Sequence, residues 1–106
     1  MDEIKNCRKK IDELDRKLVE LINERAECAR EIGRLKRDTR LPIYEPEREK
    51  TIFANVCGAN RGPLPDRLLL QVYERLIDVM RQIQKDESVP KGASGGENEI
   101  EAEANE

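Results

Sequence analysis

The feature that most constrains this chain is a heptad repeat of apolar residues near its start. Residues 3–37 contain no proline, and their apolar side chains recur every seven residues in two series: Ile4, Ile11, Leu18 and Ile32 in one, and Cys7, Leu14, Leu21, Cys28 and Leu35 in the other. Such series are typical of the a and d positions of a helix that packs along a partner. A helix of about 35 residues is about 50 Å long. We therefore expect a partner chain along its apolar stripe.

Two further helices are predicted after the break at residues 37–44. Pro46 suits the first position of a helix over residues 46–57, with Gly58 just past its end. A third helix is predicted over residues 65–86, because apolar residues recur there at helical spacing. The fold class is therefore all-α, with three helices per chain and a very long first helix. We expect the aromatic side chains Tyr44, Phe53 and Tyr73 in the core.

The composition changes near residue 86, which divides the chain into a helical domain, 1–86, and a tail, 87–106. A Gly- and Ser-rich stretch is followed by five glutamates in the last ten residues, so we expect a disordered acidic tail. Residues 86–106 carry six more acids than bases, which leaves a net charge of +3 on residues 1–85. With 37% hydrophobic residues, this domain is also expected to complete its core by forming a homodimer.

Composition excludes several classes of protein. The chain has no histidine, which rules out Ser-His and Cys-His triads and histidine zinc sites. No apolar run approaches the ~18 residues of a membrane span, and no apolar signal segment begins the chain, so we expect a cytoplasmic protein without a membrane partner. The basic domain could suit a nucleic acid, an anionic lipid surface or a small anion. The aromatic share of 3% argues against a base-stacking surface for nucleic acid.

Arg25 occupies a position of the heptad series where an apolar residue is expected. It is either a device that sets register, a side chain that snorkels to solvent, or an anion-binding group within a helical core. Lys36 lies eleven residues on, nearly three whole turns, and so shares a face with Arg25. Arg8 points about 100° away, but in an antiparallel dimer it could approach from the partner. Arginine forks in such a site suit a small dicarboxylate.

These residues also carry a resemblance to a known family. The stretches Arg8–Asp15, Leu18–Arg25 and Ala29–Lys36 resemble the first helix of the all-α (type II) chorismate mutases. Pro42–Glu49 resembles the family's loop and second helix, and Tyr73–Ile77 with Gln84 is similar to its third. The resemblance spans residues 3–85. It implies chains interlocked as a homodimer, and conversion of chorismate to prephenate in phenylalanine and tyrosine biosynthesis, without a metal or other cofactor.

The reaction is an intramolecular Claisen rearrangement, in which negative charge grows on the ether oxygen as the C–O bond breaks. A pocket accelerates it by holding a compact conformer of the dianion and by aiming donors at that oxygen. The resemblance implies that Arg25 and Arg8 of the partner subunit bind carboxylates. It also implies that Lys36 contacts a carboxylate and the ether oxygen, and that Gln84 donates to the ether oxygen. Lys36 and Gln84 are thus the expected catalytic residues.

The other expected contacts surround the ring hydroxyl of the substrate. The resemblance implies that Glu49 accepts a hydrogen bond from it and that the chain at Glu45 approaches it, although Glu45 could simply cap the second helix. Arg48 is expected to support the site by pairing with a carboxylate side chain. Met80 stands where many relatives carry a small polar residue, so one hydrogen bond to the substrate is missing or replaced.

Two alternatives remain open at this point. An isochorismate pyruvate lyase of the same fold would have a similarly cationic pocket, and only the expected hydroxyl contact of Glu49 favours the mutase. A non-catalytic dimerisation or regulatory module would explain the heptads, with Arg25 as a register device. Such a module has no need of Lys36, Glu49 and Gln84 at these spacings.

Overall fold

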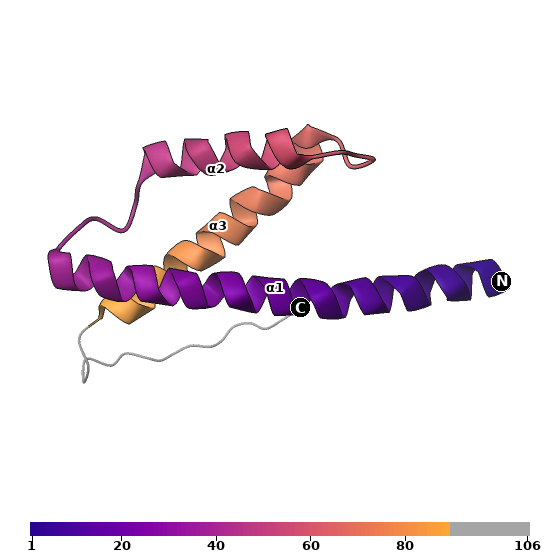
Figure 1. The fold of residues 1–106 in the computed structure, drawn as a ribbon, viewed down its shortest axis with the longest axis horizontal. Coiled ribbons are helices and arrows are strands. Elements are labelled where there is room, and N and C mark those ends of the chain that lie inside the picture. Colours follow the sequence, from indigo (N-terminus) through magenta and orange to yellow (C-terminus); the bar gives the residue numbers. More distant parts are fainter. Residues whose placement is uncertain (90–106) are drawn as a thin grey trace.

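The computed structural model describes residues 1–89, which form three helices and no strands (Figure 1). They are α1 (Asp2–Thr39), α2 (Pro46–Ala59) and α3 (Asp66–Ser88). The predicted all-α fold with a very long first helix is confirmed. Gly58 continues α2 instead of following it, because the chain leaves that helix at Asn60 in an extended conformation.

Helix α3 continues two residues beyond the predicted boundary at residue 86. Glu87, which the composition places in the tail, is half-buried against α1. Its carboxylate pairs with Arg30 at 3.2 Å and lies 3.8 Å from Arg34, and its backbone carbonyl accepts a hydrogen bond from Arg37 at 3.1 Å. These contacts hold the end of α3 to α1. The expected disorder of the acidic tail concerns residues 90–106, which lie outside the described residues.

The end of α1 directs the chain back toward the other helices. Arg40 adopts the left-handed conformation with φ 59°, and the next amide, of Leu41, bonds to the carbonyl of Lys36 at 3.0 Å. This geometry satisfies carbonyl groups that the helix end would leave unpaired. The following loop therefore turns back immediately and brings Ile43 and Glu45 close to the last turns of α1.

Helix α3 packs against both α1 and α2, whereas the backbones of α1 and α2 do not approach each other. Figure 1 shows α3 running diagonally between its two neighbours. The crossing with α1 is close at Gly33, where an added Cβ atom would lie 2.8 Å from the backbone oxygen of Gln84. A glycine is needed here because any side chain would separate the two backbones.

A single chain leaves most of the apolar stripe of α1 uncovered. The buried apolar residues are Ala29, Ile77 and Met80. Seven of the nine heptad side chains are 42–59% exposed: Ile4, Ile11, Leu14, Leu18, Leu21, Ile32 and Leu35. The N-terminal half of α1 projects well beyond α2 and α3 (Figure 1). Tyr44, expected in the core, is 58% exposed.

Candidate functional site

Lys36 is the buried charge around which the site is built. It lies on the inner face of α1 and is 6% exposed. Its Nζ donates to the side-chain Oε1 of Gln84 at 3.0 Å and to the carbonyl of Ile43 at 2.9 Å, and it pairs with the carboxylate of Glu45 at 2.8 Å. An ammonium group has three donors, so all three have partners. This compensation is what makes a buried charge tolerable.

The contact with Lys36 determines which way the amide of Gln84 faces. An ammonium group only donates, so the oxygen of Gln84 must point toward Lys36 and its Nε2 must point elsewhere. Within residues 1–89, the Nε2 group of Gln84 has no acceptor, and Gln84 lines the pocket described below. The arrangement thus combines a buried cation with an adjacent amide donor.

The side chain of Glu45 does not cap α2, which was one of the two roles that the sequence allowed for it. It occupies the N-cap position of α2 but makes no side-chain capping bond. Its carboxylate instead pairs with Lys36, while half of its side chain stays exposed. An exposed carboxylate on a buried cation is the partner that an incoming anion can displace most readily.

Glu49 is held by an arginine that sequence reasoning missed. Both the Nε and Nη2 atoms of Arg81 donate to Oε2 of Glu49, at 3.2 and 2.8 Å. This hydrogen bond raises the pKa of the Arg81 guanidinium above its ordinary value, against the opposing effect of desolvation. The sequence did hold a signal, because residues 77, 80, 81 and 84 recur at i, i+3, i+4 and i+7 and thus share one helical face.

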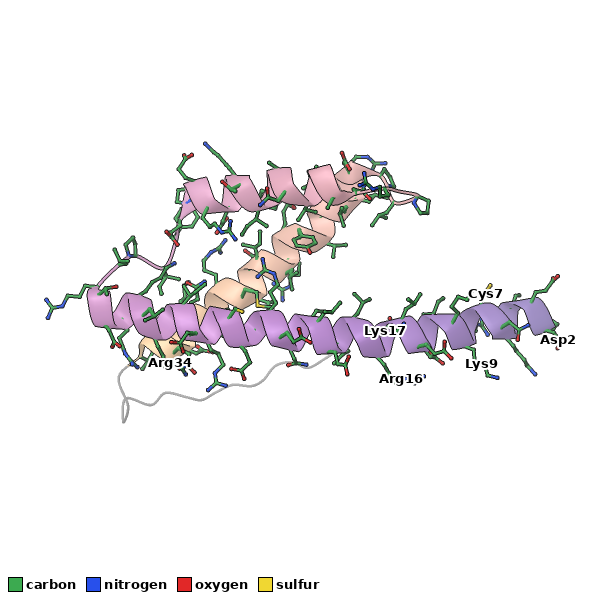
Figure 2. The ribbon with its side chains drawn as sticks, in the orientation of Figure 1. Asp2, Cys7, Lys9, Arg16, Lys17 and Arg34 are labelled. Carbon is green, nitrogen blue, oxygen red and sulfur yellow. The ribbon has the colours of Figure 1, made fainter. Side chains whose placement is uncertain are left out.

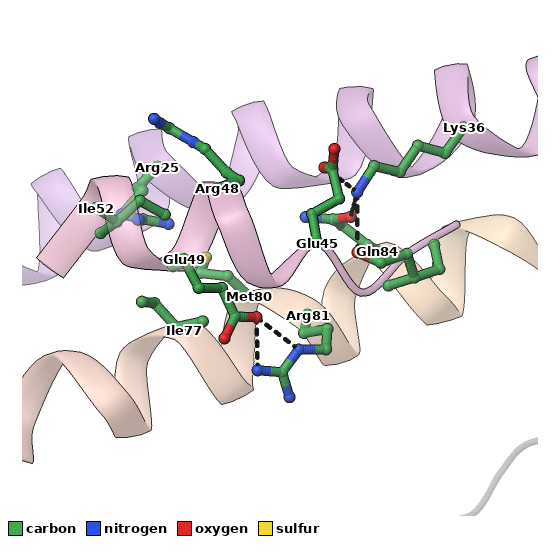
Figure 3. Close-up of a pocket in the computed structure, with 11 residues that line it drawn as sticks. Arg25, Lys36, Glu45, Arg48, Glu49, Ile52, Ile77, Met80, Arg81 and Gln84 are labelled. Atoms are coloured by element: carbon green, nitrogen blue, oxygen red, sulfur yellow. Dashed lines mark hydrogen bonds and ion pairs between the residues drawn. The ribbon is translucent and has the colours of Figure 1, made fainter. Parts of the chain in front are cut away.

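Arg48 does not make the ion pair expected of it. In the described part of the chain no carboxylate pairs with Arg48, and the guanidinium beside Glu49 is that of Arg81. Figure 3 shows the Arg48 side chain directed away from both. Arg48 still lines the pocket, where its charge is exposed and free to meet a ligand.

The three helices and the loop line a cationic pocket that is open to solvent on one side, with about 380 Å³ of empty space that includes part of this solvent (Figure 3). Four cations and two carboxylates line it, which leaves a net positive charge suited to an anion. The other lining groups are an amide and four apolar side chains. The full lining consists of Arg25, Lys36, Ile43, Glu45, Arg48, Glu49, Ile52, Ile77, Met80, Arg81 and Gln84.

Six of the seven predicted site residues therefore meet in one pocket, and Arg8 does not. Arg8 is not among the lining residues. Its neighbours Cys7 and Lys9 lie near the free end of α1, far from α2 and α3 (Figure 2). The buried Met80 occupies the pocket wall as an apolar surface, so it offers no hydrogen bond there.

The pocket continues along α1 toward the uncovered heptad stripe. A neighbouring hollow shares Arg25, Arg48 and Gln84 with it and is also lined by Cys28 and Ile32. Both of these are exposed residues of the heptad series. A second chain laid along that stripe would consequently form part of the wall of the site.

Residues 1–89 contain no group of three histidine, cysteine or carboxylate side chains arranged to bind a metal ion. Over the same residues, none of the helices combines the length and apolar character needed to cross a membrane.

Comparison with known proteins gives a consistent result. The family described as "Chorismate mutase type II" matches residues 7–85. The bifunctional chorismate mutase/prephenate dehydratase of Aquifex aeolicus is 37% identical over 80% of this chain, which spans only 25% of that protein. The chorismate mutase of Methanocaldococcus jannaschii is 31% identical over 80% of this chain and 87% of its own length. The solved structure of the Helicobacter pylori chorismate mutase in complex with prephenate has a TM-score of 0.75 at 29% identity and covers 82% of this chain and 94% of its own.

Proposed function

The chain belongs to the type II chorismate mutase family, and on that premise we propose that it converts chorismate to prephenate. The observation that carries the proposal is the pairing of buried Lys36 with the amide of Gln84 at 3.0 Å inside a pocket with excess positive charge. The reaction moves no atom into or out of the substrate. Positioning and electrostatic stabilisation are therefore all that the pocket has to supply.

Two groups act on the ether oxygen in this proposal. As the C–O bond breaks, negative charge grows on that oxygen, and Lys36 with the Nε2 of Gln84 donates to it. Donors that strengthen their contact only as charge develops lower the barrier more than they tighten substrate binding. Lys36 keeps its bonds to Gln84 and Ile43, and the one donor that Glu45 gives up is shared between the ether oxygen and a substrate carboxylate.

The remaining groups hold the substrate in its compact conformer. Arg25 and Arg48 offer guanidinium groups to the carboxylates. Glu49 accepts a hydrogen bond from the ring hydroxyl, and the chain at Glu45 approaches the same group. We place Arg8 of the partner subunit against the second carboxylate, because the pocket opens onto the uncovered stripe of α1 at Cys28 and Ile32. The functional unit in this proposal is a homodimer with two sites.

An assay of two substrates tests the proposed activity against its nearest alternative. With chorismate, NMR should show loss of substrate and appearance of prephenate, and Lys36→Ala should slow both by at least roughly 10²-fold. With isochorismate, no pyruvate should be released. Release of pyruvate without prephenate formation would identify a lyase instead, and a protein inactive on both substrates would support a non-catalytic helical module.

A further inference from the structure

Arg81 connects three elements at the edge of the pocket. From α3 its Nε and Nη2 atoms donate to Glu49 on α2, and its Nη1 donates to Asp78 at 3.1 Å. Its Cζ atom lies 5.4 Å from the centre of the Tyr44 ring, within the range of a cation–π contact. The side chains of Arg81 and Glu49 are only 25% and 20% exposed. Arg81 is therefore held in one place by contacts on several sides.

The geometry of this pair leaves half of the Glu49 carboxylate unused. Both donors of Arg81 converge on Oε2, as Figure 3 shows. The other oxygen, Oε1, has no partner among residues 1–89. A carboxylate held through one oxygen keeps a defined orientation, and its second oxygen can still accept a hydrogen bond from a ligand hydroxyl.

Charge gives a second reason for an arginine at this position. A bare carboxylate in a pocket for a dianion would repel the substrate, since like charges disfavour each other at short range. A guanidinium in contact with Glu49 offsets that repulsion and leaves the acceptor in place.

We propose that Arg81 is a positioning residue that orients Glu49 and offsets its charge, so that the free Oε1 atom can accept the ring hydroxyl of chorismate. This inference rests on the proposed function and extends it by one residue. Arg81 acts through Glu49 in this scheme and makes no contact with the reacting atoms.

A double-mutant cycle on kcat/KM tests the proposal. Arg81→Met keeps an unbranched side chain and removes the guanidinium, and it should lower kcat/KM by roughly 10- to 100-fold, the scale of a misplaced substrate contact. Most of the loss should be in KM, because the hydroxyl contact is made in the ground state as well as the transition state. In a Glu49→Ala background, the same change should cost no more than about twofold, since Arg81 then has no side-chain acceptor to orient. Arg81→Lys should restore part of the loss by returning the charge without the fork.

Asp78→Asn is the matched control, because it removes the negative charge of another partner of Arg81 and leaves the bond to Glu49 intact. Its kcat/KM should stay within about twofold of wild type. Circular dichroism and the midpoint of thermal unfolding should be compared for every variant. If Arg81→Met does not fold, the cycle is run with Arg81→Lys.

Additive losses in the cycle, or an unchanged kcat/KM in Arg81→Met, would overturn the proposal while leaving mutase activity standing. Absence of mutase activity in the wild-type chain would overturn both.

Discussion

The amide of Gln84 can face only one way while Lys36 remains beside it. Its oxygen accepts from the Lys36 ammonium at 3.0 Å, so the Nε2 group is available to a ligand. Lys36 in turn is buried and fully partnered, which fixes its own position. Two residues from different helices thus orient each other. In the proposed mechanism, this mutual orientation preorganises the donors for charge that appears only in the transition state.

We predict that Gln84→Ala lowers kcat substantially and changes KM less. Losing one donor to a developing anion typically costs roughly 10²–10³-fold in rate. Lys36→Ala should be at least as severe and should also raise KM, because it removes a charge that holds a carboxylate. Steady-state kinetics on chorismate measure both effects. Near-full activity in Gln84→Ala would remove Gln84 from the mechanism.

Gln84→Glu should make activity depend on pH in a defined direction. An ionised carboxylate only accepts hydrogen bonds, so it cannot serve the ether oxygen at neutral pH. As the pH falls and the introduced carboxyl group becomes protonated, it regains a donor, and kcat should rise. The wild-type protein measured over the same range is the control. A flat profile in the variant would contradict the donor role of Gln84.

At the scale of helices, the crossing of α1 and α3 at Gly33 determines whether the site forms. Here a Cβ atom would lie 2.8 and 2.9 Å from backbone atoms of Gln84 and 3.1 Å from the Cβ of Glu87. Backbone atoms cannot yield as a flexible side chain can. The close approach of α1 and α3 at this glycine also holds Gln84 of α3 within hydrogen-bond distance of Lys36 on α1.

We predict that Gly33→Ala destabilises the protein and lowers kcat. Alanine gains up to about 1 kcal/mol in helix propensity, but overpacking against backbone costs about 1–3 kcal/mol, so the clash should prevail. Helix α3 should shift and displace Gln84. The control is Gly58→Ala in α2, where an added Cβ meets nothing within 4 Å, so the unfolding midpoint should stay constant or rise. Equal unfolding midpoints and equal kcat for the two variants would contradict this account of the crossing.

At the scale of the whole molecule, a second copy of the chain would account both for the uncovered heptad stripe and for the distance of Arg8 from the pocket. Seven heptad side chains are exposed on a single chain, and Arg8 lies on the part of α1 that leaves the bundle. A second copy along α1 would bury the stripe and bring an arginine to each open pocket. We expect sedimentation equilibrium at micromolar concentration to show twice the chain mass. A stable folded monomer would contradict this.

Mixing two inactive variants tests whether Arg8 acts across the interface. Arg8→Ala and Lys36→Ala should each lose most activity alone. If they are unfolded and refolded together, hybrid dimers should contain one site with both residues intact, so activity should partly return. The same mixture without refolding is the control. Lack of recovery from confirmed hybrid dimers would place Arg8 outside the partner's site.

Truncation should show whether the helical domain ends at residue 86, as the composition predicts, or after the end of α3 at Ser88. Removing residues 90–106 should leave activity and the unfolding midpoint unchanged, because the Gly-, Ser- and Glu-rich composition there cannot build a core. Ending the chain after Asp86 also removes Glu87 and its contacts with Arg30, Arg34 and Arg37. Each such partly exposed ion pair is worth about 0.2–1 kcal/mol, so thermal unfolding should shift down by several degrees. An equally stable shorter chain would show that Glu87 contributes nothing.

The patterned parts of the sequence were sufficient to predict the three helices. The heptads over residues 3–37, the proline at 46 and the apolar spacing of residues 69–83 all act locally, since helix formation depends on neighbours three and four positions away. Resemblance then assigned six residues that the structure brings to one pocket: Arg25, Lys36, Glu45, Arg48, Glu49 and Gln84. Helix ends were less well predicted, because Glu87 is held in α3 by partners about fifty residues away.

The pairings inside the pocket depend on how the helices cross, and no local pattern encodes them. The sequence predicts an ion pair for Arg48 without naming its partner, whereas in the structure it is Arg81 that pairs with Glu49, from the opposite helix. Likewise, Glu45 could cap α2, and it pairs with Lys36 only because the left-handed turn at Arg40 brings the loop back over α1. Spacing along a helix says which side chains share a face. Which side chain from another element meets that face depends on the angle and distance of the crossing, and where α1 crosses α3 the close approach depends on the missing side chain of Gly33.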